Sequence, residues 1–202
     1  MRKLITLLIL LVAFTATTST STRLIEFTQA DDERSLERFK YRIELAEMKK
    51  MYAKGLEGFL EHLAKRESSN NPTIVNTYGY IGKYQFGRAA LKEVGCDSVT
   101  VTKFIKDPSV FPEEVQDEAV VKLMKINRER IGKLVDTYKG KTINGVEITE
   151  AGLLAAAHLA GAGGVKRFLK SNGKYNPADG YGTKLTNYLK DFQHHKINLK
   201  YV

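Results

Sequence analysis

Apolar residues recur every three or four positions along much of the chain, and this spacing predicts amphipathic helices rather than strands. One such pattern covers residues 35–54 and a second covers residues 56–66. Gly55 and Gly58 interrupt the sequence between and within these patterns, so we expect two separate helices here. The run Ser-Ser-Asn-Asn-Pro at residues 68–72 predicts the end of the second helix.

A third helix and a hairpin are predicted in the middle of the chain. Pro112 is suited to the start of a helix, and Glu113 and Glu114 place negative charge in its first turn, where the helix dipole favours it. Asn144 and Gly145 form a dipeptide typical of the two-residue turn between short antiparallel strands.

The C-terminal part of the chain again has helical spacing. Thr149 is a suitable cap for a helix over residues 151–160, which we expect to break at Gly161 before a short helical segment at 165–169. A last helical pattern covers residues 185–192. The pattern as a whole predicts a mainly α fold, a single helical domain with one or two small β-hairpins.

The N-terminus has the order of a secretory signal peptide. Two basic residues precede an apolar run over residues 4–14, and small hydroxylated residues follow it. We therefore predict a signal peptide over residues 1–21, a short linker over 22–34 and one domain over 35–202. The apolar run is about 16 Å long as a helix, roughly half of a ~30 Å hydrocarbon core. We expect an exported protein, periplasmic or secreted, with no stable membrane span; a short uncleaved anchor is the alternative.

The charge balance favours a polyanionic partner. Lysine and arginine number 32 against 23 aspartates and glutamates, which gives a net charge of +9. The chain has no recognisable nucleic-acid motif and no dense basic amphipathic stretch, so we expect no nucleic acid as partner. Cys96 is the only cysteine and cannot form an intramolecular disulfide. We expect the protein to be a monomer.

A candidate for chemistry lies at the end of the second predicted helix. Glu67 is followed directly by Ser68 and then by an Asn-Pro pair at 71–72, and Gln85 lies in the segment 82–87. This series resembles the lysozyme-like superfamily, specifically the soluble lytic transglycosylase type of domain. That family has a Glu-Ser pair, an Asn-Pro pair and a Gly-Leu-Met-Gln element. Here a Lys-Tyr pair stands where Leu-Met is usual.

Two later features extend the resemblance. Residues 157–161 stand where the family has Ala-Tyr-Asn-Ala-Gly, with His158 and Leu159 replacing Tyr and Asn, and Tyr188 is the counterpart of a late tyrosine. The resemblance implies that Glu67 is the catalytic acid and base. It also implies a substrate-binding set without cofactor or metal, which consists of Ser68, Gln85, His158 and Tyr188. We add Tyr84, which departs from the family pattern, because a tyrosine ring offers a flat face for a sugar ring.

The position of Glu67 agrees with the needs of glycosidic cleavage. The leaving oxygen must receive a proton, so the acid must be kept uncharged near neutrality. Carbonyl groups at a helix C-terminus favour the uncharged form by only ~0.3–1 kcal/mol, less than the ~1.36 kcal/mol that corresponds to one pKa unit. Burial must supply the rest, and we expect it from the aromatic residues Tyr78, Tyr80, Tyr84 and Phe86.

The sequence near Glu67 offers no second acid. The next acidic residue is Glu93, and ordinary two-carboxylate glycosidases need a partner as base or nucleophile. This absence favours a route with a single acid, in which the substrate supplies its own nucleophile. Asp97, Asp117 and Glu150 remain alternatives, because distance along the chain is not distance in space.

These observations lead to one expected function and two alternatives. The expected function is a peptidoglycan lytic transglycosylase that cleaves the β-1,4 bond between N-acetylmuramic acid and N-acetylglucosamine. The alternatives are a hydrolytic muramidase and a non-catalytic wall-binding module on the same fold.

His194 and His195 could bind a metal as a pair, but adjacent histidines without acidic companions are typical of solvent-facing positions.

Overall fold

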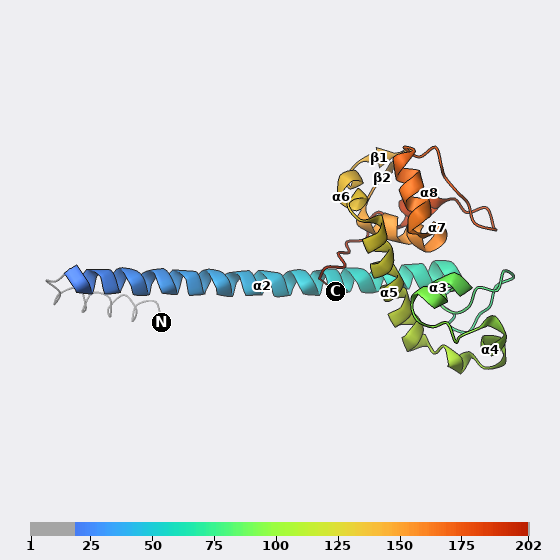
Figure 1. The fold of residues 1–202 in the computed structure, drawn as a ribbon, viewed down its shortest axis with the longest axis horizontal. Helices are drawn as coiled ribbons and strands as arrows, with labels where there is room; N and C mark the ends of the chain where they lie inside the picture. Colours follow the sequence, from blue (N-terminus) through green and yellow to red (C-terminus); the bar gives the residue numbers. More distant parts are fainter. Residues whose placement is uncertain (1–18, 202) are drawn as a thin grey trace. The chain divides into compact units, whose positions relative to one another are not determined.

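A computed structural model gives the structure of residues 19–201, with side chains described from Asp32 onward (Figure 1). The predicted signal peptide lies almost entirely outside the described residues. The chain divides into two compact units between Met48 and Lys49, and each is considered by itself. Within residues 19–201 no helix is both long and apolar enough to serve as a membrane span.

The first long helix, α2, runs from Ser19 to Ser68 without a break. It includes the predicted linker over residues 22–34, and it passes through Gly55 and Gly58, so the prediction of two separate helices is wrong. A glycine costs a helix only about 1 kcal/mol relative to alanine, which packing of the residues around it can offset. A glycine at position 55 also allows a close approach of another segment, since a Cβ there would lie 1.9 Å from the carbonyl oxygen of Lys196.

The apolar pattern of residues 35–54 predicted the helix correctly, but it does not mark a buried face in the structure. Leu36, Phe39 and Ile43 are 53%, 60% and 44% exposed. The buried hydrophobic residues begin at Leu56 and belong to the unit that starts at Lys49.

Three helices form the centre of this second unit (Figure 1). The helix α7, Glu150–Lys170, packs against both α5, Glu113–Ile131, and α8, Leu185–Phe192. Thr149 caps α7 as predicted, because its Oγ1 accepts a hydrogen bond from the Gly152 N–H at 3.1 Å. Gly161 has non-helical dihedral angles, φ 65° and ψ 165°, so α7 consists of two helical segments that meet at a kink there, and the predicted break at Gly161 is confirmed.

Short elements complete the unit. The predicted hairpin is formed by β1, Thr142–Ile143, and β2, Val146–Glu147, with Asn144 and Gly145 both at positive φ. The remaining short helices are α3 (Arg88–Glu93), α4 (Val101–Lys106), η1 (Pro108–Val110) and α6 (Leu134–Tyr138). The mainly α fold with a small hairpin is thereby confirmed.

Candidate active site

Glu67 lies in the last turn of α2, one residue before the helix ends. The chain leaves the helix through Ser69 and Asn70, both of which have left-handed φ values, 56° and 63°. Their backbone N–H groups donate to the carbonyls of Lys65 and Ala64, so the end of the helix is satisfied by its own continuation. The Ser-Ser-Asn-Asn-Pro run therefore ends the helix as predicted and fixes the position of Glu67.

A buried amide is one of the groups that attach the loop that follows to α5. Gln116 is 1% exposed. Its Oε1 accepts from the Lys83 N–H at 2.6 Å, and its Nε2 donates to the Pro72 and Phe111 carbonyls at 2.8 Å and 2.7 Å. A Cβ at Gly82 would lie 2.3 Å from the same Oε1, so a glycine is needed at this close approach. Nothing in the local sequence around Gln116 points to this role.

Ser68, predicted to bind substrate, instead connects the end of α2 to this loop. It is 8% exposed and is absent from the cavity lining described below. Its Oγ lies 2.8 Å from the Lys83 carbonyl oxygen, to which it donates, and it accepts from the Asn71 N–H at 2.9 Å. The interpretation as a helix-ending hydroxyl therefore fits the structure better than a direct contact with sugar.

The Tyr84 side chain is also not where a substrate contact requires it. It is 1% exposed, and its hydroxyl donates to Asp117 Oδ1 at 2.7 Å. Burial, together with this bond and the negative charge of Asp117, raises the pKa of the Tyr84 phenol above its ordinary value. The Lys83 ammonium donates to the same carboxylate at 3.0 Å and to Glu113 at 2.9 Å. The Lys-Tyr pair that departs from the family pattern thus forms a polar link to α5.

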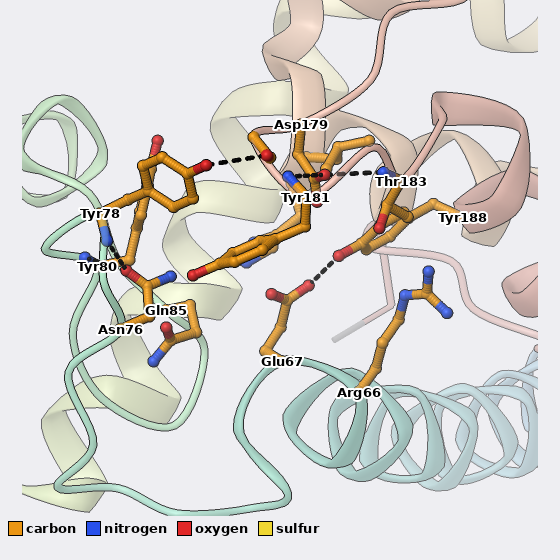
Figure 2. A pocket seen from close by; sticks show the side chains of 13 residues that line it. Arg66, Glu67, Asn76, Tyr78, Tyr80, Gln85, Asp179, Tyr181, Thr183 and Tyr188 are labelled. Atoms are coloured by element: carbon orange, nitrogen blue, oxygen red, sulfur yellow. Dashed lines mark hydrogen bonds between the residues drawn. The ribbon is translucent and has the colours of Figure 1, made fainter.

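A cavity of about 770 Å³ lies beside Glu67 (Figure 2). Its walls come from the end of α2, from two loops, and from α7 and α8. The lining residues are Arg66, Glu67, Asn76, Tyr78, Tyr80, Gln85, His158, Leu159, Asp179, Gly180, Tyr181, Thr183 and Tyr188. All of them belong to the unit that starts at Lys49.

Glu67 is held at this cavity by Tyr188 of α8. The Tyr188 hydroxyl donates to Glu67 Oε1 at 2.5 Å, as Figure 2 shows. No described residue forms a hydrogen bond with the other carboxyl oxygen, Oε2. On the ring of Tyr188, the Arg66 guanidinium carbon lies 4.2 Å from the centroid, and Arg66 also forms an ion pair with Asp191. The tyrosine is thus fixed from two sides, and one carboxyl oxygen of Glu67 remains free.

Burial raises the pKa of the Tyr188 phenol, and the neighbouring Glu67 charge and hydrogen bond raise it further, while Arg66 acts in the opposite direction. The phenol therefore stays protonated across the physiological range and acts as a donor to Glu67. The resemblance alone marked Tyr188 as a site residue; the structure adds its hydrogen bond.

Gln85 and His158, two members of the predicted substrate-binding set, also line the cavity. Gln85 has a left-handed φ of 51°, and its Nε2 donates to the Gly82 carbonyl at 2.9 Å, which closes its own turn. The His158 Nε2 lies 2.8 Å from the Tyr84 carbonyl oxygen, and since a carbonyl can only accept, this nitrogen carries the hydrogen. Tyr84 thus supports the site through its backbone rather than its ring.

A second loop, at residues 178–184, contributes residues that the sequence analysis missed. Asp179 Oδ1 accepts from the N–H groups of Tyr181 and Thr183 at 2.9 Å and 2.8 Å, so the side chain organises the turn. Asp179 is nevertheless part of the cavity lining, which makes it the second carboxylate there. Asp97, Asp117 and Glu150, considered earlier as partners of Glu67, do not line the cavity.

Two loops meet on the side of the cavity away from Tyr188 (Figure 2). The Tyr78 hydroxyl donates to the Gly180 carbonyl at 2.9 Å, and the rings of Tyr78 and Tyr181 pack edge to face with centroids 4.9 Å apart. Tyr78, Tyr80 and Tyr181 remain 57%, 44% and 63% exposed. Of the aromatic residues expected near Glu67, Tyr78 and Tyr80 line the cavity, whereas Phe86 is buried in the core.

The structure thus brings together Glu67, Gln85, His158 and Tyr188, and it leaves Ser68 and the Tyr84 ring outside the lining. Among the described residues, one group has ring nitrogens or carboxylates arranged closely enough to hold a metal ion, and it consists of His62, His194 and His195. That group is not part of the cavity lining.

Comparison of the chain with family models, with characterised proteins and with solved structures gives no significant match. The resemblance to the lysozyme-like superfamily therefore depends on the quoted residues alone.

Proposed function

We propose that the protein is a peptidoglycan lytic transglycosylase in which Glu67 acts first as acid and then as base. The observation that carries this proposal is the hydrogen bond from Tyr188 to Glu67 at the wall of a sugar-sized cavity. A half-buried carboxyl with one oxygen held and the other free is the arrangement that proton transfer to a bound glycan needs.

The proposed chemistry follows from the state of the two carboxyl oxygens. Because Oε1 accepts the hydrogen bond from the Tyr188 hydroxyl, we assign the acidic hydrogen of Glu67 to Oε2. Glu67 gives this proton to the glycosidic oxygen while the bond between that oxygen and the anomeric carbon of muramic acid breaks. The muramic residue's own hydroxyl then attacks the anomeric carbon and returns its proton to Glu67. An anhydro ring closes, and no water is consumed.

The cavity lining is suited to a carbohydrate. Sugar rings present flat C–H faces that pack on aromatic rings, and exposed tyrosines add hydroxyl groups for hydrogen bonding. Tyr78, Tyr80 and Tyr181 provide such surfaces beside Glu67. The excess of basic residues favours association with an anionic wall polymer at close range.

The test is digestion of cell-wall sacculi by the protein lacking its predicted signal peptide, followed by mass analysis of the released muropeptides. We expect anhydro products, lighter by one water than the corresponding reducing-end products. Intact sacculi, or reducing-end products only, would contradict a transglycosylase.

The role of Glu67 is tested by Glu67→Gln, which keeps the shape of the side chain and its acceptor oxygen for Tyr188 but removes the acidic proton. We expect product release to fall by at least about a thousandfold, as for other positioned catalytic groups. Glu61→Gln is the matched control, since Glu61 lies on the same helix and is exposed. A wall-binding module without turnover would bind sacculi equally in all three proteins and release nothing from any of them.

Asp179 specifically favours the hydrolytic muramidase as second candidate, because it is a second carboxylate in the lining. Asp179→Asn distinguishes the two routes, since an amide oxygen still accepts the N–H groups of Tyr181 and Thr183. If Glu67 acts alone, we expect less than a tenfold loss and unchanged anhydro products. Reducing-end products from the unaltered protein and a loss above about a hundredfold in Asp179→Asn would establish hydrolysis.

A further inference from the structure

Three of the four histidines of this chain meet outside the cavity, although one of them is more than a hundred residues from the other two in sequence. His62 lies on α2, while His194 and His195 follow the end of α8. One ring nitrogen from each lies within 4.8 Å of the others. We propose that His62, His194 and His195 bind one divalent transition-metal cation of the Zn²⁺ type. This inference does not depend on the proposed glycosidase activity.

The spacing of the ring nitrogens suits a common cation. His62 Nδ1 and His195 Nε2 are 3.0 Å apart. Two imidazole nitrogens bound to one tetrahedral zinc at ~2.0–2.1 Å lie about 3.3 Å from each other. A cation therefore requires these two nitrogens to separate by a few tenths of an ångström and the rings to turn so that both lone pairs face it. His194 is exposed, so its side chain can make the remaining adjustment.

Aromatic packing holds two of the three rings in position. His62 stacks on Phe192 with centroids 4.3 Å apart, and His195 lies 5.7 Å from the same ring and 5.6 Å from Phe59. Phe59 and Phe192 are fully buried. Folding of the core thus already orders these two side chains, so a cation that binds here loses less free energy to ordering its ligands.

The chemistry of the ligands favours a borderline metal over calcium or magnesium. Imidazole nitrogens suit Zn²⁺, Co²⁺, Ni²⁺ and Cu²⁺, whereas Ca²⁺ and Mg²⁺ require oxygen ligands. The carboxylate that acts electrostatically on His62, Asp191, is paired with Arg66, and Lys65 adds a positive charge, so the imidazoles are the ligands on offer. One hydrogen is shared between His62 Nδ1 and His195 Nε2 in the metal-free protein, so binding requires the imidazole that carries it to adopt its other neutral tautomer, with the hydrogen on the remote ring nitrogen.

A cation here would connect α2 to the segment that follows α8. Glu67 lies five residues after His62 on α2, and Tyr188 lies six residues before His194. The Arg66–Asp191 ion pair connects α2 to α8 itself. The metal would therefore strengthen the pairing of α2 with α8 that also brings Tyr188 to Glu67.

The test is titration of the untagged, chelator-treated protein with Zn²⁺ alone by calorimetry, and with Co²⁺ alone by visible absorption. We expect one cation per chain with a dissociation constant below about 100 µM, a cobalt spectrum typical of nitrogen ligands, and a rise in Tm that EDTA reverses. Absence of saturable binding would overturn the proposal.

Two exposed variants separate this site from adventitious binding. His194→Ala should weaken Zn²⁺ binding at least about tenfold and leave the Tm in EDTA unchanged, since the side chain is not packed in the core. Lys190→Ala, an exposed control on α8, should bind as the unaltered protein does. Equal affinity in His194→Ala, or equal loss in both variants, would show that these histidines are not the site.

Discussion

The arrangement around Glu67 shows how one hydrogen bond can direct a carboxyl group. Tyr188 approaches from α8, 121 residues later in the chain, and its hydroxyl takes one of the two carboxyl oxygens. A phenol whose pKa lies above its ordinary value keeps its proton at neutral pH and can donate it in this hydrogen bond, which leaves the other carboxyl oxygen for a ligand in the proposed mechanism. Arg66 fixes the face of the ring, which limits its rotation away from Glu67.

Tyr188→Phe isolates this hydrogen bond, because the ring and its contacts with Arg66 and Phe192 remain. We expect the rate of sacculus digestion to fall roughly 10–100-fold, the loss expected from one positioned donor worth ~1.4–2.7 kcal/mol. Tyr175→Phe is the control, since Tyr175 also lies under an arginine, Arg167, but does not line the cavity. Equal rates for the two variants would show that the hydroxyl of Tyr188 does not act on Glu67.

At the scale of elements, local sequence predicted what depends on local interactions. Four features were predicted because each follows from the preferences of a few adjacent residues. They are the start of α5, the Asn144-Gly145 turn, the Thr149 cap and the end of α2. Gly55 was read as a helix break, whereas the structure relates this glycine to the close approach of the Lys196 carbonyl, far along the chain. Tyr84, Asp179 and the three histidines illustrate the same limit, since their environments are made by contacts between distant segments.

Gln116 helps to attach the loop at residues 71–86 to α5. Replacing its amide group tests how much this attachment stabilises the fold. Gln116→Leu leaves the Lys83 N–H and the Pro72 and Phe111 carbonyls without their partner. We expect the free energy of unfolding to fall by at least about 3 kcal/mol in urea denaturation, since three buried groups lose their partner and each unsatisfied group costs ~1–3 kcal/mol. Gln193→Leu, at a partly exposed position, should change it by less than about 0.5 kcal/mol. A loss below 1 kcal/mol in Gln116→Leu would mean that water replaces the amide.

At the scale of the whole molecule, the buried core and the cavity both belong to the unit that starts at Lys49, among the residues whose side chains the structure describes. Its buried residues form one core, and every residue of the cavity lining belongs to it. None of the side chains described between Asp32 and Met48 is buried. The apolar residues Leu36, Phe39 and Ile43 therefore contribute helical spacing to the sequence without contributing to the core.

A truncated variant beginning at Lys49 tests this division. Since it retains the core and the last 20 residues of α2, we expect its Tm to lie within about 2 °C of that of the longer protein, the shift that a surface change of ~0.5 kcal/mol produces in a domain of this size. Basic residues outnumber acidic ones in residues 49–202, so attraction to an anionic wall should also persist. Digestion of sacculi and thermal unfolding, measured on both proteins, check the two expectations separately. A fall in Tm above about 5 °C would show that residues before Lys49 stabilise the domain, and an unchanged Tm with lost digestion would show that they serve the wall rather than the fold.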